Sequence, residues 1–127
     1  MAFNGVLLRG AVYVIDAKKY KSIKNRKTKH VICLQQGKIT ERYNTFTAIL
    51  INTNSLEKTK DPRNYIDKCD VHIPPEICNY EYGAVAKCAE IFTFHIQDII
   101  KFAYFLPKEI MEEIDYKLLF GIGVDAL

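Results

Sequence analysis

The residues of this chain best suited to hold a charged ligand are the cations between Ala17 and Thr40. The segment contains eight cations and no acid: Lys18, Lys19, Lys21, Lys24, Arg26, Lys27, Lys29 and Lys38. It separates two apolar runs, Val12–Ile15 and Val31–Leu34, and a loop between two strands presents its side chains on a fixed frame. The natural ligand of such a loop is a polyanion, and nucleic acid is the first candidate. The alternative is a solvated loop that binds nothing.

The rest of the chain is acidic. The formal net charge of +3 comes from 18 Lys and Arg against 15 Asp and Glu, so without the eight loop cations 10 basic residues face the same 15 acids. Acids also outnumber lysines in the C-terminal stretch Lys108–Leu127. We therefore expect a polarised molecule with one basic face.

Length and composition indicate one domain that spans residues 1–127, and with 49% hydrophobic residues this domain can bury a real core. No apolar stretch approaches the roughly 18 residues that cross a membrane, and the N-terminus lacks a signal-peptide pattern. The four cysteines are unclustered, which fits free thiols in a reducing compartment. These features predict a cytoplasmic protein without membrane contact.

Apolar periodicity and turn residues divide the chain into five or six short strands. We expect strands at Leu7–Asp16, His30–Gln35, Phe46–Thr53, Asp70–Ile73, Gly83–Phe94 and Lys101–Leu106, with a short helical turn at Gln97–Ile100. Pro74 and Pro75 stop the fourth strand, because proline lacks the N–H that a strand ladder needs.

A helix follows the last strand. Pro107 stands at the expected first helical position, and the acids that follow it suit the positive end of the helix dipole. An apolar stripe runs along one side of the helix: Ile110, Met111, Ile114 and Leu118. Strands and helix together predict a mainly β fold with flanking α structure, arranged as a small, strongly bent barrel or half-barrel.

The order of motifs resembles that of the MazF/PemK-type toxins of toxin–antitoxin pairs. Arg9–Asp16 is similar to the family's opening strand, R-G-x-V/I-W/Y-x-x-D/N. Lys27–Gln35 occupies the place of K-T-R-P-V-V/L-V/I-I/L-Q, which closes the family's basic loop. Thr53 stands where the next family strand ends in Ser or Thr, and Val85–His95 is similar to a later strand. The resemblance covers nearly the whole chain.

The resemblance implies an SH3-like β-barrel of the MazF/PemK/CcdB type with a C-terminal helix. It also implies a sequence-specific endoribonuclease that cuts single-stranded RNA without a metal or another cofactor. The expected partners are RNA, a second copy of the chain in a homodimer, and a small acidic antitoxin whose disordered peptide silences the enzyme. By position, the family's catalytic pair falls on Lys29 and Thr53.

The chain departs from the family pattern at this site. Lys29 replaces the family's arginine, and His30 replaces the proline that follows it. In the PemK branch an arginine and an aspartate of the fifth strand do acid–base work, and Lys87 and Ala89 stand there; Glu90 replaces a glutamine. A second interpretation therefore stays open, a member of the same fold that binds RNA or a protein without cutting.

RNA cleavage without metal requires a base for the 2′-hydroxyl proton, a cation for the crowded phosphorane and an acid for the leaving 5′-oxygen. Lys29 can supply the cation, and Thr53 can donate a hydrogen bond to a phosphate oxygen. His30 has an imidazole whose ordinary pKa of about 6.5 suits proton transfer, and Glu90 can act as a base if it is partly buried. The alternatives are structural: a histidine at the edge of a core strand and a threonine that caps a turn.

The other residues expected to contact RNA belong to the basic loop and to one later strand: Lys18, Lys19, Tyr20, Lys21, Lys24, Arg26, Lys27 and Lys87. We expect Tyr20 to be exposed, as a platform on which a base stacks. Lys87 and Glu90 are three residues apart in a strand, so they lie on opposite faces unless a bulge intervenes.

A zinc site is the weaker alternative. Cys69, His72, Cys78 and Cys88 supply four possible ligands, but their spacing is not that of paired zinc knuckles. His72 and Cys88 also fall inside expected strands. We therefore expect no metal site.

Overall fold

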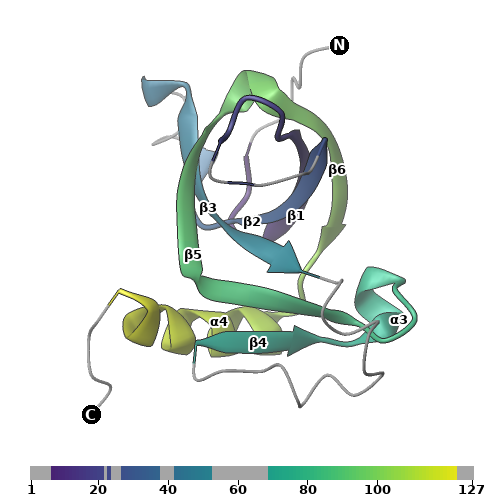
Figure 1. Cartoon of the computed structure of the whole chain (residues 1–127). Helices are drawn as coiled ribbons and strands as arrows, with labels where there is room; N and C mark the ends of the chain where they lie inside the picture. Colours follow the sequence, from purple (N-terminus) through teal and green to yellow (C-terminus); the bar gives the residue numbers. More distant parts are fainter. Residues whose placement is uncertain (1–6, 22, 24–26, 38–41, 53–68, 123–127) are drawn as a thin grey trace.

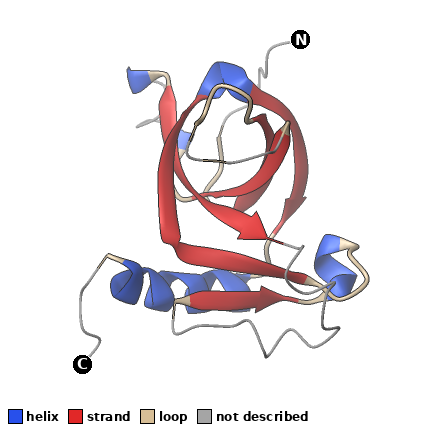
Figure 2. Ribbon diagram, viewed as in Figure 1, coloured by secondary structure: helices blue, strands red, loops and turns tan. Residues whose placement is uncertain are grey.

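The protein, seen here as a computed structural model, is described for residues 7–21, 23, 27–37, 42–52 and 69–122. Its elements in chain order are β1 (Ala11–Asp16), β2 (Thr28–Cys33), β3 (Thr45–Asn52), β4 (Asp70–Ile73), α3 (Pro75–Cys78), β5 (Ala84–His95), the 3-10 helix η2 (Ile96–Asp98), β6 (Ile99–Phe105) and α4 (Lys108–Gly121). Figure 2 shows the strands wrapping into a barrel that stands above α4. The expected mainly β fold with a C-terminal helix is confirmed.

One antiparallel sheet contains all these strands, in the order β4-β5-β3-β2-β1-β6. β5 is long enough to serve two layers: one part forms the barrel wall and the other pairs with β4 beneath the barrel (Figure 1). A bulge allows this bend, since Ile49 of β3 pairs with Ile91 whereas the next residue, Leu50, pairs with Lys87. β4 and β6 remain the edges of the sheet, so the barrel is not closed by a ladder of hydrogen bonds.

Alternation along the strands separates two hydrophobic cores. The barrel core fills the curled sheet with Leu7, Ala11, Tyr13, Ile15, Ala17, Ile23, Val31, Cys33, Phe46, Ala48, Leu50, Phe94 and Ile99. The helix core lies on the other face and contains Val12, Ile32, Ile49, Ile51, Val71, Ile73, Cys78, Ala84, Ala86, Cys88, Leu106, Met111 and Ile114. Successive residues of a strand therefore belong to opposite faces, which we call the barrel face and the helix face.

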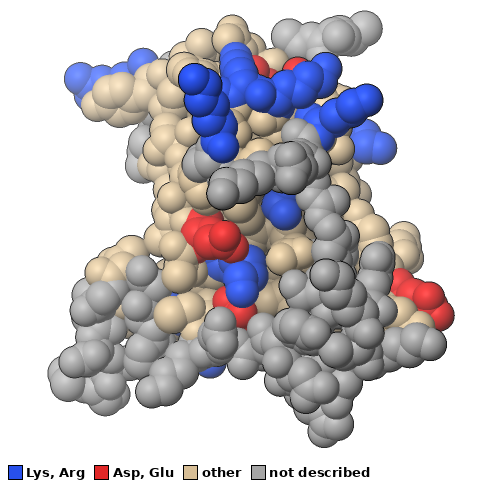
Figure 3. All heavy atoms as spheres, in the orientation of Figure 1, with Lys and Arg blue, Asp and Glu red and all other residues tan. Residues whose placement is uncertain are grey.

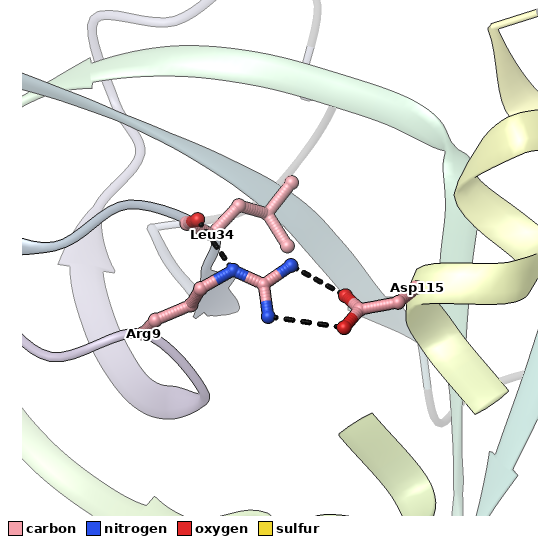
Figure 4. Close-up of polar contacts among 3 residues, drawn as sticks. All are labelled: Arg9, Leu34 and Asp115. Carbon is pink, nitrogen blue, oxygen red and sulfur yellow. Dashed lines mark hydrogen bonds and ion pairs between the residues drawn. The ribbon is translucent and has the colours of Figure 1, made fainter. Parts of the chain in front are cut away.

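The Arg9-Gly10 pair docks α4 onto the sheet. Both terminal nitrogens of Arg9 donate hydrogen bonds to the carboxylate of Asp115 in α4, and its Nε donates to the carbonyl of Leu34 at 2.9 Å (Figure 4). Gly10 has a φ of +89°, and a Cβ there would lie 3.2 Å from Cγ of Met111. The opening motif of the chain thus has a structural role, because it lets the helix approach the turn before β1.

The observed boundaries differ from the expected ones by a few residues. β1 begins at Ala11 because the residues before it form a turn, in which the Ala11 N–H donates to the carbonyl of Leu8 at 3.1 Å. β2 begins earlier than expected, at Thr28, and the helical turn η2 ends at Asp98, so β6 starts at Ile99. The short helix α3 was not expected. In the described part of the chain, no helix is both long and apolar enough to span a membrane.

Candidate active site

The start of β2 and the end of β3 bring Lys29 and Asn52 to the same face of the sheet. Val31 pairs with Leu50, and extending this antiparallel register by two residues places Lys29 across from Asn52. Lys29 also pairs with Ile15, a barrel-core residue, so both polar side chains belong to the barrel face. Lys29 and Asn52 are half-buried. Thr53, the expected partner of Lys29, directly follows Asn52 and lies outside the described residues.

His30 lies on the helix face, opposite Lys29. It pairs with Val14, which on its other side pairs with Lys101. The half-buried His30 ring meets Tyr80 edge-on, with 6.1 Å between ring centroids and 82° between ring planes. Burial lowers the pKa of His30, and the charges of Lys101 and Lys29 lower it further. The structure therefore does not bring His30 and Lys29 into one site.

Lys87 is fixed by a buried carboxylate. Its Nζ lies 2.7 Å from Oδ2 of Asp70, whose side chain is 3% exposed. Lys87 pairs with Leu50 on one side and with Asp70 on the other, so it shares the barrel face with the barrel-core residue Leu50. Sequence reasoning placed Lys87 near RNA but missed Asp70, which looked like the first residue of a short strand.

Glu90 is exposed, so it does not meet the condition of partial burial under which it was expected to act as a base. It belongs to the bulge of β5, where Cys88–Glu90 have no pairing partner in β3. The bulge is the exception that the sequence left open: alternation alone does not place Lys87 and Glu90 on opposite faces.

His72 is the histidine that shares the face of Lys29. It pairs with Val85, which in turn pairs with Asn52, so one cross-strand row runs from His72 towards Lys29. Its Nε2 lies 3.4 Å from the carbonyl oxygen of Tyr82. A Cβ at Gly83 would come within 2.5 Å of that nitrogen, so the glycine leaves room for the ring. The sequence had named His72 only as a possible zinc ligand.

The basic loop between β1 and β2 exposes four of its expected RNA ligands, Lys18, Lys19, Lys21 and Lys27. Figure 3 shows Lys and Arg side chains gathered at the upper end of the molecule, the end of the barrel near η2. Lys24 and Arg26 lie outside the described residues. The gathered positive charge matches the expected basic face and suits a polyanion.

Two loop residues contact the buried carboxylate of Asp98. Lys19 Nζ lies 2.7 Å from Oδ1 of Asp98, a carboxylate that is 8% exposed. Tyr20 is half-buried: its hydroxyl donates to Oδ2 of Asp98, and its ring meets the edge of Phe94. The expectation of an exposed Tyr20 for base stacking is therefore wrong, because the ring packs against the barrel core.

The four cysteines and His72, all described residues, do not gather into one cluster. Within the described ranges, no three His, Cys, Asp or Glu side chains lie close enough together to hold an ion. Cys33, Cys69, Cys78 and Cys88 are unbridged. Burial raises the pKa of the Cys88 thiol to about 12, and Cys78 Sγ lies 3.4 Å from the carbonyl oxygen of Pro74.

Comparison with known proteins fixes the family. Residues 8–120 match the sequence model of a family described as PemK-like, MazF-like toxin of type II toxin-antitoxin system. This chain belongs to that family. The match begins at the turn that docks α4 and ends within α4, so it includes every strand described above.

Solved structures share the fold of this PemK-like protein at low sequence identity. An endoribonuclease from a mycobacterial species superposes with a TM-score of 0.72 at 14% identity, over 98% of this chain and 99% of that one. A mycobacterial endoribonuclease in complex with its cognate antitoxin gives 0.71 at 14% identity, over 95% and 99%. MazF (Form-I) from Deinococcus radiodurans gives 0.72 at 10% identity, over 95% and 100%. No protein of curated function matches the chain by sequence.

Proposed function

We propose that this family member is an endoribonuclease that cleaves single-stranded RNA without a metal ion. The observation that carries the proposal is the position of Lys29. It follows the basic loop directly, lies within a strand rather than in the loop, and shares the barrel face with Asn52 at the end of β3. Fold neighbours named as endoribonucleases support the same activity.

The proposed reaction is a transfer within RNA. The 2′-oxygen attacks the adjacent phosphorus, its proton passes to a base, and the bond from phosphorus to the 5′-oxygen breaks as an acid protonates that oxygen. Lys29 stabilises the negative charge of the phosphorane. Lys87, held by Asp70, adds an ammonium donor on the barrel face, although the pair as a whole is neutral. Thr53 and Asn52 orient phosphate oxygens.

Proton transfer is assigned to His72 rather than to His30, because His72 shares the barrel face with Lys29. The strands β5 and β3 lie between His72 and Lys29, so the assignment requires RNA that lies across this row. The His72 imidazole is a side chain of the type that can take a proton from one atom and return it to another. Glu90 remains the alternative base, although its exposure in the β5 bulge keeps it solvated.

Two partners are proposed with the activity. The basic loop suits an acidic antitoxin peptide, and a fold neighbour is a complex with a cognate antitoxin. A second copy of the chain would cover the apolar side chains that the edge strand β6 leaves exposed: Ile100, Phe102 and Phe105. We propose a cytoplasmic homodimer whose two copies each form one domain.

The test is incubation of the purified protein with long single-stranded RNA in the presence of EDTA, with matched duplex RNA beside it. Cleavage of the single strand only, lost in Lys29→Ala, is the expected result. RNA that stays intact over a wide range of protein concentrations would eliminate the enzymatic proposal.

A protein that binds RNA without cutting it is the second candidate, and one observation favours it. Lys29 is a point charge and lacks the guanidinium fork that fits two phosphate oxygens. This candidate predicts salt-sensitive RNA binding and no product. If the wild type binds RNA without cutting it and the Lys29→Arg variant cuts RNA, the protein is this non-cleaving binder.

A further inference from the structure

One buried carboxylate fixes the middle of the basic loop. Asp98 is the last residue of η2. One of its carboxylate oxygens accepts a hydrogen bond from the Tyr20 hydroxyl, and the other forms an ion pair with Lys19 at 2.7 Å. The Tyr20 hydroxyl oxygen in turn accepts the backbone N–H of His95 at 3.0 Å. The corner between β5 and β6 therefore holds the loop through a chain of polar contacts.

Apolar packing strengthens this attachment. The ring centroids of Tyr20 and Phe94 are 5.0 Å apart with planes at 78°, and Ile23 is 7% exposed within the barrel core. The Ile23 N–H donates to the Tyr20 carbonyl at 2.9 Å. Burial raises the pKa of Tyr20 to about 12, with the bond to Asp98 as the next cause, so the hydroxyl remains a donor at neutral pH.

The same loop keeps other cations directed to solvent. Lys18, Lys21 and Lys27 are exposed, and in the described part of the chain none of them takes part in an ion pair. The Ala17 N–H donates to the carbonyl of Lys27 at 3.0 Å, which closes the base of the loop. The loop thus divides into an inner set of anchoring side chains and an outer set of charges.

We propose that Tyr20 and Asp98 form a clamp that positions the β1–β2 loop so that Lys18, Lys21 and Lys27 meet the RNA backbone together. The inference rests on the proposed function and assigns both clamp residues a positioning role, because they turn away from solvent. A loop that is held before binding loses less conformational freedom when RNA arrives. The clamp therefore raises RNA affinity without adding charge.

For the variant Asp98→Asn, charge alone and the clamp predict changes in RNA affinity of opposite direction. Asp98→Asn removes a negative charge and releases Lys19, so attraction to RNA phosphates should rise if charge alone decides affinity. If the clamp positions the loop, the same variant binds RNA more weakly. The direction of the change therefore separates the two explanations.

The experiment measures RNA affinity by fluorescence anisotropy with an uncleavable 2′-O-methyl strand at several salt concentrations. Tyr20→Phe keeps every charge and the ring, and the loss of its hydroxyl contacts should weaken binding by about threefold to tenfold. KM for cleavable RNA should rise while kcat and the urea midpoint stay near the wild-type values. Tyr43→Phe is the matched control, since Tyr43 is 63% exposed and lies outside the clamp.

Hydrogen exchange at the His95 amide gives a readout that needs no RNA, and it should accelerate in Tyr20→Phe. Tighter binding by Asp98→Asn, or unchanged affinity and exchange in Tyr20→Phe, would overturn the clamp while the proposed function stands. If wild type binds no RNA, the proposed function fails and takes the RNA role of the clamp with it. Faster exchange would then show a purely structural contact.

Discussion

Lys29 and His30 are adjacent in the chain, but β2 turns them to opposite faces, so alanine at each position should have a different effect. Lys29→Ala removes the cation that we assign to the phosphorane. Loss of one such preorganised charge lowers the cleavage rate by about 10²- to 10³-fold. Stability should change by less than about 1 kcal/mol, because the half-buried side chain belongs to the edge of the barrel core.

His30→Ala should show the reverse pattern. The imidazole is half-buried and meets Tyr80 edge-on, and an aromatic pair contributes about 0.5–1.5 kcal/mol beyond burial. With the apolar area that is lost as well, the free energy of unfolding should fall by about 1–2 kcal/mol. Cleavage by the protein that remains folded should stay close to the wild-type rate.

Single-turnover cleavage with excess protein and urea unfolding, measured on the same preparations, separate these effects. His30→Gln, which keeps a polar side chain of similar length, is the control for loss of the ring. A folded His30→Ala protein that loses cleavage as severely as Lys29→Ala would show that the imidazole reaches the reacting atoms. The assignment of Lys29 and His30 to different faces would then be refuted.

Three further perturbations address the frame of the site. Gly10→Ala should lower the free energy of unfolding by about 1–2 kcal/mol, because φ is +89° there and the new Cβ would press on Met111. An unchanged thermal midpoint would contradict this prediction. Asp70→Ala should lower the free energy of unfolding by about 3 kcal/mol, because it leaves Lys87 without its buried partner. The double variant Asp70→Ala with Lys87→Met should recover most of this loss in urea unfolding, and a double variant as unstable as Asp70→Ala would argue against the pair. Burial and nearby lysine charges lower the pKa of His30, so the unfolded chain takes up the proton first and stability should fall as pH drops below about 6.5. His30→Gln should flatten that slope, and an identical slope would exclude His30 as its source.

The fold could be predicted because local patterns and the order of motifs point to the same answer. Alternation in Ala11–Asp16 sends Tyr13 to the barrel core and Val12 to the helix core. The apolar stripe of the last helix is confirmed, since Met111 and Ile114 are buried. Such patterns repeat over many residues, so an error of one or two residues at a strand end does not change the architecture.

The site could be predicted only as positions along the chain. Sequence spacing does not show that β5 contains a bulge, so the sequence alone could not predict whether Lys87 and Glu90 lie on the same face of the strand. The burial of Tyr20 depends on Asp98, a residue 78 positions away. Asp70 looked like an ordinary strand residue, because its partner Lys87 belongs to another strand. Each of these features is a contact between distant segments, and contacts of that kind leave no local pattern.

Antiparallel pairing of β2 and β3 explains why a lysine at position 29 can still serve the proposed reaction. The start of β2 and the end of β3 meet, so Lys29 stands on a strand next to Asn52, while the loop before it carries the exposed cations. A strand fixes the backbone of Lys29 before RNA arrives, so only the side chain must reorganise, and a charge that needs little reorganisation stabilises a phosphorane effectively. The missing guanidinium fork removes one directed hydrogen bond but leaves this placement intact. The geometry therefore favours a slower nuclease over an inert one, and Lys29→Arg should quicken cleavage rather than create it.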